Sequence, residues 1–231
     1  MRGIGSVIFL VFALSGTQAL AKAYSFSTPA NSTDSAAEPV SAKATFSVSA
    51  GSMVVTLINL QSGTVSVGQD ISSLFFTVNN GGTILSLASA DLVGSSGTEV
   101  TILAGGAVSG VHAVSPVTHW AAGSSAGQSY LNDLISGGNP IHTIIGPAST
   151  GGNYATVNTT IAGNATNNPF IQSQATFTFS NPGLLASSTV SNVSIGFGTV
   201  AASAVRAVPE PGSLFLVSIG MLAALRRSLG R

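Results

Sequence analysis

The residues with the widest chemical scope in this chain are three histidines, His112, His119 and His142. A zinc ion needs three or four converging ligands, and His112, His119 and an acid such as Asp133 have suitable donor atoms. The spacing matches no helical ligand pair, and two residues seven positions apart on an extended chain point to opposite faces. We therefore expect histidines held in strands or loops, with no metal and no other cofactor.

Hydrolytic chemistry would need a nucleophile with its base and acid, or two partnered carboxylates. Residues 123–127 contain glycines and serines in no βαβ context, so we interpret them as a turn. The acids of the central region have no partner in their local sequence: Asp70, Asp91, Glu99 and Asp133. We therefore expect no enzyme. A secreted hydrolase is the third hypothesis and requires the histidines and acids to converge, while a calcium ion on Asp70, Asp91 or Asp133 is left open.

Aromatic and hydroxyl side chains favour a binding function more than catalysis. His119, Trp120, Tyr130 and Tyr154 would suit stacking on sugar rings if they formed an exposed strip, although we expect them to pack in the core. Strands rich in threonine, such as residues 176–178, would add hydroxyl groups. A carbohydrate- or ice-surface-binding module is therefore the second hypothesis.

The C-terminal residues 208–231 form the most specific pattern of the chain. Pro209 and Pro211 flank Glu210 and exclude a helix up to that point. Residues 212–225 carry no charge, and a basic tail, 226–231, follows. An apolar helix before arginines predicts a transmembrane span with its basic end in the cytoplasm. The span is short, and arginine snorkelling or local thinning of the bilayer can make up the difference.

This pattern resembles the PEP-CTERM sorting signal of exported bacterial proteins, on these residues: Val208, Pro209, Glu210, Pro211, Arg226 and Arg227. The same domain is also labelled an ice-binding protein C-terminal domain, a label that says nothing about ice. The resemblance implies recognition by an exosortase, a membrane cysteine transpeptidase, with cleavage near the Pro-Glu-Pro. It also implies transfer to the cell surface or an extracellular polysaccharide matrix, where an exopolysaccharide is a candidate partner.

The N-terminal residues 1–23 have the pattern of a secretory signal peptide. Arg2 precedes a short apolar run, and small residues follow it. We expect cleavage after Ala23, with cleavage after Ala21 as the alternative. This predicts export through the Sec translocon, processing by signal peptidase, and inner-membrane anchoring by the C-terminal helix before surface sorting.

The charge balance between residues 24 and 205 argues against a nucleic-acid partner. Lys43 is the one basic residue of this region, against six acidic ones, and phosphate binding draws on clusters of lysine and arginine. The chain also has no cysteine. Disulfides, thiolate nucleophiles and cysteine-ligated metals are therefore excluded.

Residues 43–200 have the pattern of a mainly β passenger domain. Strand-like segments recur about every ten residues, at 44–49, 52–60, 63–68, 74–78, 83–88, 99–103, 111–117, 175–180 and 190–197, with turns at 50–51 and 79–82. One short helix is expected at 128–136, where Leu131, Leu134 and Ile135 have helical spacing. We predict an antiparallel β-sandwich or jelly-roll-like fold, with a flexible leader at 24–42 and a linker at 201–207. Its loose apolar pattern is similar to that of β-rich passengers in many uncharacterised PEP-CTERM proteins.

Overall fold

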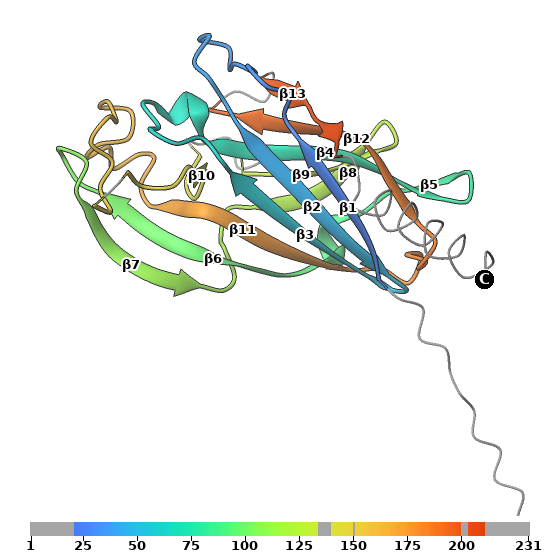
Figure 1. Ribbon diagram of the computed structural model, residues 1–231. Helices are drawn as coiled ribbons and strands as arrows, with labels where there is room; N and C mark the ends of the chain where they lie inside the picture. The colour runs from blue at the N-terminus through green and yellow to red at the C-terminus, as the bar shows by residue number, and fades with distance from the viewer. Residues whose placement is uncertain (1–20, 134–139, 150, 200–202, 211–231) are drawn as a thin grey trace, which may run out of the picture.

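The computed structural model describes residues 21–133, 140–149, 151–199 and 203–210 (Figure 1). The first 20 residues of the predicted signal peptide, the predicted transmembrane helix at 212–225 and the basic tail at 226–231 lie outside these ranges. Within them, the chain is mainly β, with two short 3-10 helices, η1 Val67–Gln69 and η2 Ser89–Asp91. The predicted fold class is therefore confirmed at this level. No helix within the described ranges is long and apolar enough to span a membrane.

Fourteen strands of the described ranges belong to one hydrogen-bonded sheet. Their bounds are β1 Lys22–Ser27, β2 Ala42–Ser49, β3 Ser52–Asn59, β4 Ile71–Asn80, β5 Thr83–Leu85, β6 Leu92–Ile102, β7 Val108–Val114, β8 Ala121–Ser125, β9 Gln128–Asn132, β10 Ile144–Ile145, β11 Phe170–Ser180, β12 Thr189–Phe197, β13 Ala204–Arg206 and β14 Val208–Pro209. The main path runs β13-β12-β4-β10-β11-β3-β2-β1-β14. The strands β5 and β9 pair with β4, β6 pairs with β11 and β7, and β8 pairs with β9.

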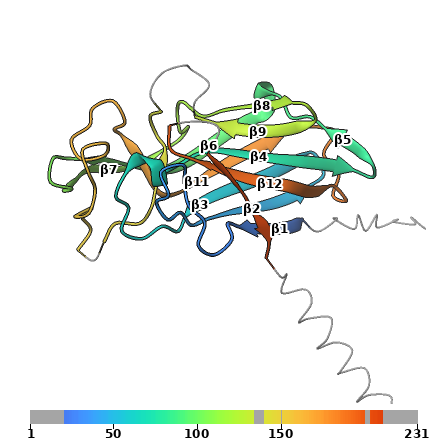
Figure 2. The same ribbon diagram turned by 90° about the horizontal axis from the view of Figure 1, so that it is seen from above.

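The sheet folds over on itself, so that β4 and β12 face β2, β3 and β11 (Figure 2). The ring of Phe76 on β4 lies 5.2 Å from that of Phe46 on β2 and 6.3 Å from that of Phe179 on β11, although three strands separate β2 from β4 along the sheet. The two-residue strand β10 joins the halves, because Ile144 pairs with both β4 and β11. The sheet is thus continuous, and its β10–β11 pair is parallel.

Alternation of apolar and polar residues explains the strands that the sequence predicted. In β2 every second residue is buried, up to Phe46 and Val48, and β3 continues the pattern after a turn in which Gly51 has a φ of 76°. The turn between β4 and β5 likewise uses Gly81 and Gly82, both with positive φ. Glycine adopts this backbone region without steric cost. These two predicted hairpins are confirmed.

The predicted helix at 128–136 is wrong over its described first half, because Gln128–Asn132 is strand β9. Ala126 and Gly127 have φ values of 49° and 77° and turn β8 directly into β9. Ser129 and Leu131 are then buried two residues apart, so hairpin pairing overrides the helical spacing. The predicted strand at 63–68 is also wrong: Ser66 caps η1 there, and its hydroxyl accepts from the Gly68 N–H.

The predicted flexible leader at 24–42 is ordered in the folded domain. Strand β1 pairs along its whole length with β2. The side chain of Phe26 is 5% exposed, and its ring lies 5.9 Å from the ring of Phe46. Val40 is buried as well. Alternation in residues 24–27 places Phe26 inward and two serines outward, which is the pattern of a strand with one buried face.

Candidate functional site

The C-terminal residues of the described chain join the two ends of the sheet. Strands β13 and β14 are the first and last of the main strand path, yet only Ala207 separates them in sequence. Figure 2 shows this red segment crossing β12 toward β1. We call residues 204–210 the clasp. The predicted linker at 201–207 is therefore wrong for its described residues, which belong to the sheet.

Backbone pairing fixes the clasp at both ends. Val205 of β13 pairs with Ile195 of β12, and β14 pairs with Phe26 and Ser27 of β1. Between them, Ala207 is 6% exposed in the core, and its N–H donates to the Val193 carbonyl oxygen at 2.9 Å. Pro209 lacks an N–H, which is tolerated in an edge strand such as β14.

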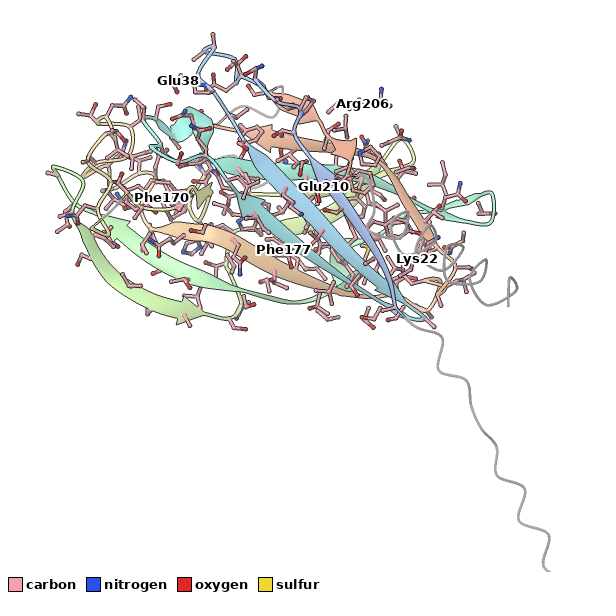
Figure 3. The ribbon with its side chains drawn as sticks, in the orientation of Figure 1. Lys22, Glu38, Phe170, Phe177, Arg206 and Glu210 are labelled. Carbon is pink, nitrogen blue, oxygen red and sulfur yellow. The ribbon has the colours of Figure 1, made fainter. Side chains whose placement is uncertain are left out.

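The carboxylate of Glu210 collects three side-chain donors from β1 and β2. Lys43 Nζ lies 2.7 Å from Oε2, and the hydroxyl groups of Ser25 and Ser27 donate to Oε2 and Oε1 at 2.8 and 2.5 Å. The Glu210 N–H also donates to the Ser25 carbonyl oxygen at 2.9 Å. Figure 3 shows Glu210 beside β1 and β2. Lys43, the one basic residue between 24 and 205, thus forms an ion pair with Glu210.

These contacts set the charge of Glu210. The hydrogen bond from Lys43 is the main cause that lowers its pKa to about 2, followed by the bonds from Ser27 and Ser25. Hydrogen bonds to a carboxylate favour its charged form. Glu210 is therefore ionised and fully partnered at neutral pH, although its side chain is still 35% exposed.

The clasp overlaps a known sequence signature. The PEP-CTERM protein-sorting motif matches residues 207–228. The chain therefore carries a PEP-CTERM sorting motif at these residues. The motif indicates exosortase-dependent sorting of a secreted protein, and the exosortase is thus its processing partner. No curated protein and no solved structure matches the chain.

The structure places only the start of the sorting motif. Val208, Pro209 and Glu210 lie in the clasp, whereas the other motif residues lie outside the described ranges: Pro211, Arg226 and Arg227. Ala21 and Ala23, the two alternative signal-cleavage positions, lie just before and within β1. Cleavage after Ala23 would remove two residues of that strand and cleavage after Ala21 none. The cleavage position stays a prediction.

Glu99 on β6 brings two of the three histidines together. Its Oε1 lies 3.1 Å from Nε2 of His112, and its Oε2 lies 2.8 Å from Nε2 of His142. The ring of His119 lies 5.7 Å from that of His142. Asp133, which we considered as their partner, instead follows β9 and donates its N–H to the Ser72 carbonyl oxygen. Sequence spacing gave no indication of the Glu99 contacts.

His142 also contacts a hydroxyl group. Thr118 Oγ1 lies 3.0 Å from Nδ1 of His142, whose other nitrogen contacts Glu99. This order resembles nucleophile, base and acid, but the same Nδ1 lies 3.2 Å from the carbonyl oxygen of Thr118. Trp120 Nε1–H donates to the His142 carbonyl oxygen as well. These contacts tie the loop after β7 to residue 142, and among the described residues no group of three acids or histidines is placed to hold a metal.

The other candidate positions are mostly structural. Trp120 and Tyr154 are buried, 7% and 2% exposed, as core packing predicts, whereas Tyr130 is half-buried and His119 exposed. Residues 123–127 form the end of β8 and the turn into β9, as expected. The Asp91 carboxylate accepts hydrogen bonds from Asn181 and from the Ala88 N–H.

Asp70 and Asp133 are buried without full hydrogen bonding. Among the described residues, both carboxylate oxygens of Asp133 and Oδ1 of Asp70 have no hydrogen-bond partner, and the hydroxyl of Thr143 donates to the other Asp70 oxygen at 3.3 Å. Burial raises the pKa of Asp133 to about 8 and raises that of Asp70 well above its ordinary value. Both groups therefore favour the protonated form.

Proposed function

We propose that this protein is a non-enzymatic component of the bacterial envelope or extracellular matrix, exported by Sec and sorted by an exosortase. In this account the helix at 212–225 holds the chain in the inner membrane until cleavage near the Pro-Glu-Pro releases it to the surface. The observation that carries the proposal is the sorting motif at 207–228. The clasp supports it, because the first residues of the motif, up to Glu210, are part of the folded domain.

Substitution of Arg226 and Arg227 by alanine tests the sorting, because neither residue belongs to the clasp. We expect the double variant to accumulate unprocessed in the inner membrane of an exosortase-bearing host. Wild-type protein should lose its basic tail and reach the surface or matrix. Fractionation followed by intact mass measurement distinguishes these species. Unchanged processing and location in the variant would contradict the proposal.

A second function, binding of a neutral polysaccharide, is favoured by a row of hydroxyl groups. Residues paired across β1, β2, β3, β11 and β6 are, in order, Ser25, Thr45, Thr56, Thr176 and Ser96. Paired residues point to the same face of a sheet, and the hydroxyl oxygens of Thr56 and Thr176 lie 3.3 Å apart. None of the five is buried, whereas their neighbours Phe46 and Phe177 are.

The row ends at a hollow of about 330 Å³ between β11, β6 and β7. Its polar lining is uncharged and includes Ser96, Thr98, Ser115, Gln174 and Thr176. Hydroxyl and amide groups can both donate and accept hydrogen bonds, as neutral sugars require. A glycan array should detect binding that the Thr176→Val variant loses and Ser47→Ala, on the same strand face but outside the row, retains. Blank arrays would eliminate this function, and a blank thermal-hysteresis assay would eliminate the ice-surface form of the same hypothesis.

The non-enzymatic part of the proposal rests on the contacts of His142, which connect loops. We expect no turnover of ester, peptide or glycoside substrates. Chromogenic substrates measured with the wild type and with His142→Gln provide the check. An activity that the wild type shows and the variant loses would favour the hydrolase hypothesis instead.

A further inference from the structure

We propose that the folded domain sets the position of sorting cleavage: the clasp withholds every peptide bond up to Glu210, so that the cut falls at Glu210–Pro211 or beyond. Lys43, Ser25 and Ser27 act as positioning residues for this limit, although none of them belongs to the sorting motif. The inference rests on the proposed processing near the Pro-Glu-Pro.

Backbone hydrogen bonds hold residues 204–210 in the sheet. Peptide-cleaving enzymes act on chain that has left its fold, so cleavage follows the population of the locally open form. In the clasp, β13 pairs with β12, β14 pairs with β1, and the N–H groups of Ala207 and Glu210 both donate to strand carbonyl oxygens. Each bond between 204 and 210 would become accessible only after these contacts open.

The side-chain contacts of the clasp concentrate at its last residue, Glu210. Glu210 is the only clasp residue whose side chain receives donors, and it receives three of them, from Lys43, Ser25 and Ser27. Charge-assisted hydrogen bonds are stronger than neutral ones. Side-chain hydrogen bonds therefore hold the clasp at Glu210, the last of its residues.

The position of the cut decides which strand edges the cleaved product exposes. A cut before Ala207 would remove β14 and expose the edge of β1, and unpaired strand edges favour aggregation. A cut after Glu210 leaves the sheet path complete from β13 to β14. The surface-attached product would then carry its new C-terminus directly on the edge of the folded domain.

In the cleavage step the peptide C–N bond breaks and the carbonyl carbon bonds to the thiol sulfur of the sorting enzyme, while the thiol proton goes to the departing amine. A hydroxyl or amine of the acceptor, or water, then takes the acyl group and returns a proton to the sulfur. The departing segment begins at Pro211 or later. Residues 204–210 stay with the domain.

The test uses the full chain in an exosortase-bearing host, with intact mass measurement of the processed species. Wild type, Lys43→Arg and the outside control Ser47→Ala should give products that end at Glu210 or later. Lys43→Met and the double variant Ser25→Ala/Ser27→Ala should raise the share of products that end within 204–209 about fivefold, because about 1 kcal/mol of clasp stability is lost. A wild-type product that ends before Glu210 would overturn the inference.

A second measurement separates this inference from the proposed function. Purified full chain is treated with a protease of broad specificity, and cuts within 204–210 are counted by mass. The clasp predicts slow cutting in wild type and about fivefold faster cutting in Lys43→Met. Equal rates would contradict the clasp, whether or not the host processes the chain. Retention of Arg231 in every host sample would instead contradict only the proposed processing.

Discussion

Glu210 in the clasp and Asp133 at the end of β9 are both carboxyl groups on the same sheet, with opposite surroundings. Glu210 is 35% exposed on its side chain and has a cation and two hydroxyl donors. Asp133 is 1% exposed, and neither of its carboxylate oxygens has a hydrogen-bond partner in the described part of the chain. The pKa of the first is lowered to about 2, mainly by the hydrogen bond from Lys43, and burial raises that of the second to about 8.

The difference shows that the amount of contact with the fold does not by itself decide the charge of an acid. Donors that approach Glu210 favour the carboxylate, whereas removal of water from Asp133 without donors favours the neutral acid. The clasp is therefore an electrostatic fastening that works at neutral pH. The raised pKa values of the buried acids Asp70 and Asp133 instead predict a stability that depends on pH.

The largest expected effect is a loss of stability as pH rises. Between the unfolded pKa of Asp133, near 3.8, and its folded pKa of about 8, the folded chain keeps a proton that the unfolded chain has lost. Stability from this group is thus complete at low pH and disappears as pH rises through 8. Asp70, also raised, acts in the same direction. Urea unfolding should give a free energy several kcal/mol lower at pH 8.5 than at pH 5.

The variant Asp133→Asn sharpens this result, because an amide does not titrate. Its free energy of unfolding should fall less between pH 5 and 8.5 than that of wild type. Glu210→Gln is the matched control: Glu210 is ionised in the folded chain and mostly ionised in the unfolded chain over this range, so the slope should stay close to that of wild type. Parallel slopes for wild type and Asp133→Asn would refute the assignment.

The next effect concerns the middle of the clasp. Ala207→Lys places a charge at a buried position, which costs about 2–4 kcal/mol. Ala204→Lys, at an exposed position of β13, should change stability by less than about 0.5 kcal/mol. Thermal or urea unfolding measures both. If the two variants are equally stable, Ala207 is not packed in the core.

The smallest effect belongs to the ion pair itself. Lys43→Met should cost about 1 kcal/mol at pH 7, because the Lys43–Glu210 pair is partly exposed. Glu210 has a lowered pKa, so its contribution is complete above its unfolded pKa of about 4.5 and is lost as pH falls toward 2. The difference between wild type and Lys43→Met should therefore shrink between pH 5 and pH 2. If the difference in unfolding free energy stays constant with pH, Lys43 contributes to stability through packing and not through its charge.

Local signals predicted much of the fold but not the clasp. The hairpin of β2 and β3 followed from alternation and a glycine turn, both of which are local. Residues 24–27 of β1 were predicted as leader and residues 204–207 of the clasp as linker. The contacts between β1 and the clasp join residues far apart in sequence: Ser25 and Glu210 are 185 positions apart. The alternation in residues 24–27 and the isolation of Lys43 were the available signals.

The candidate functional site could likewise be predicted only where its residues are contiguous in sequence. The sorting motif is contiguous, so its residues could be named from sequence, whereas Glu99 meets His142 across 43 positions and no spacing rule links them. The pairing of Glu210 with Lys43 also depends on the register of β1 against β2 and β14. Register of distant strands is a tertiary property that composition does not encode.

Amide hydrogen exchange of the full chain tests most directly the claim that the sorting segment is part of the folded domain. The N–H groups of Ala207 and Glu210 donate to Val193 and Ser25, so both should exchange at least tenfold more slowly than unstructured amides. Exchange at the unstructured rate at both positions would show that the clasp is undocked in solution. The account of a sorting signal fastened to its passenger would then be wrong.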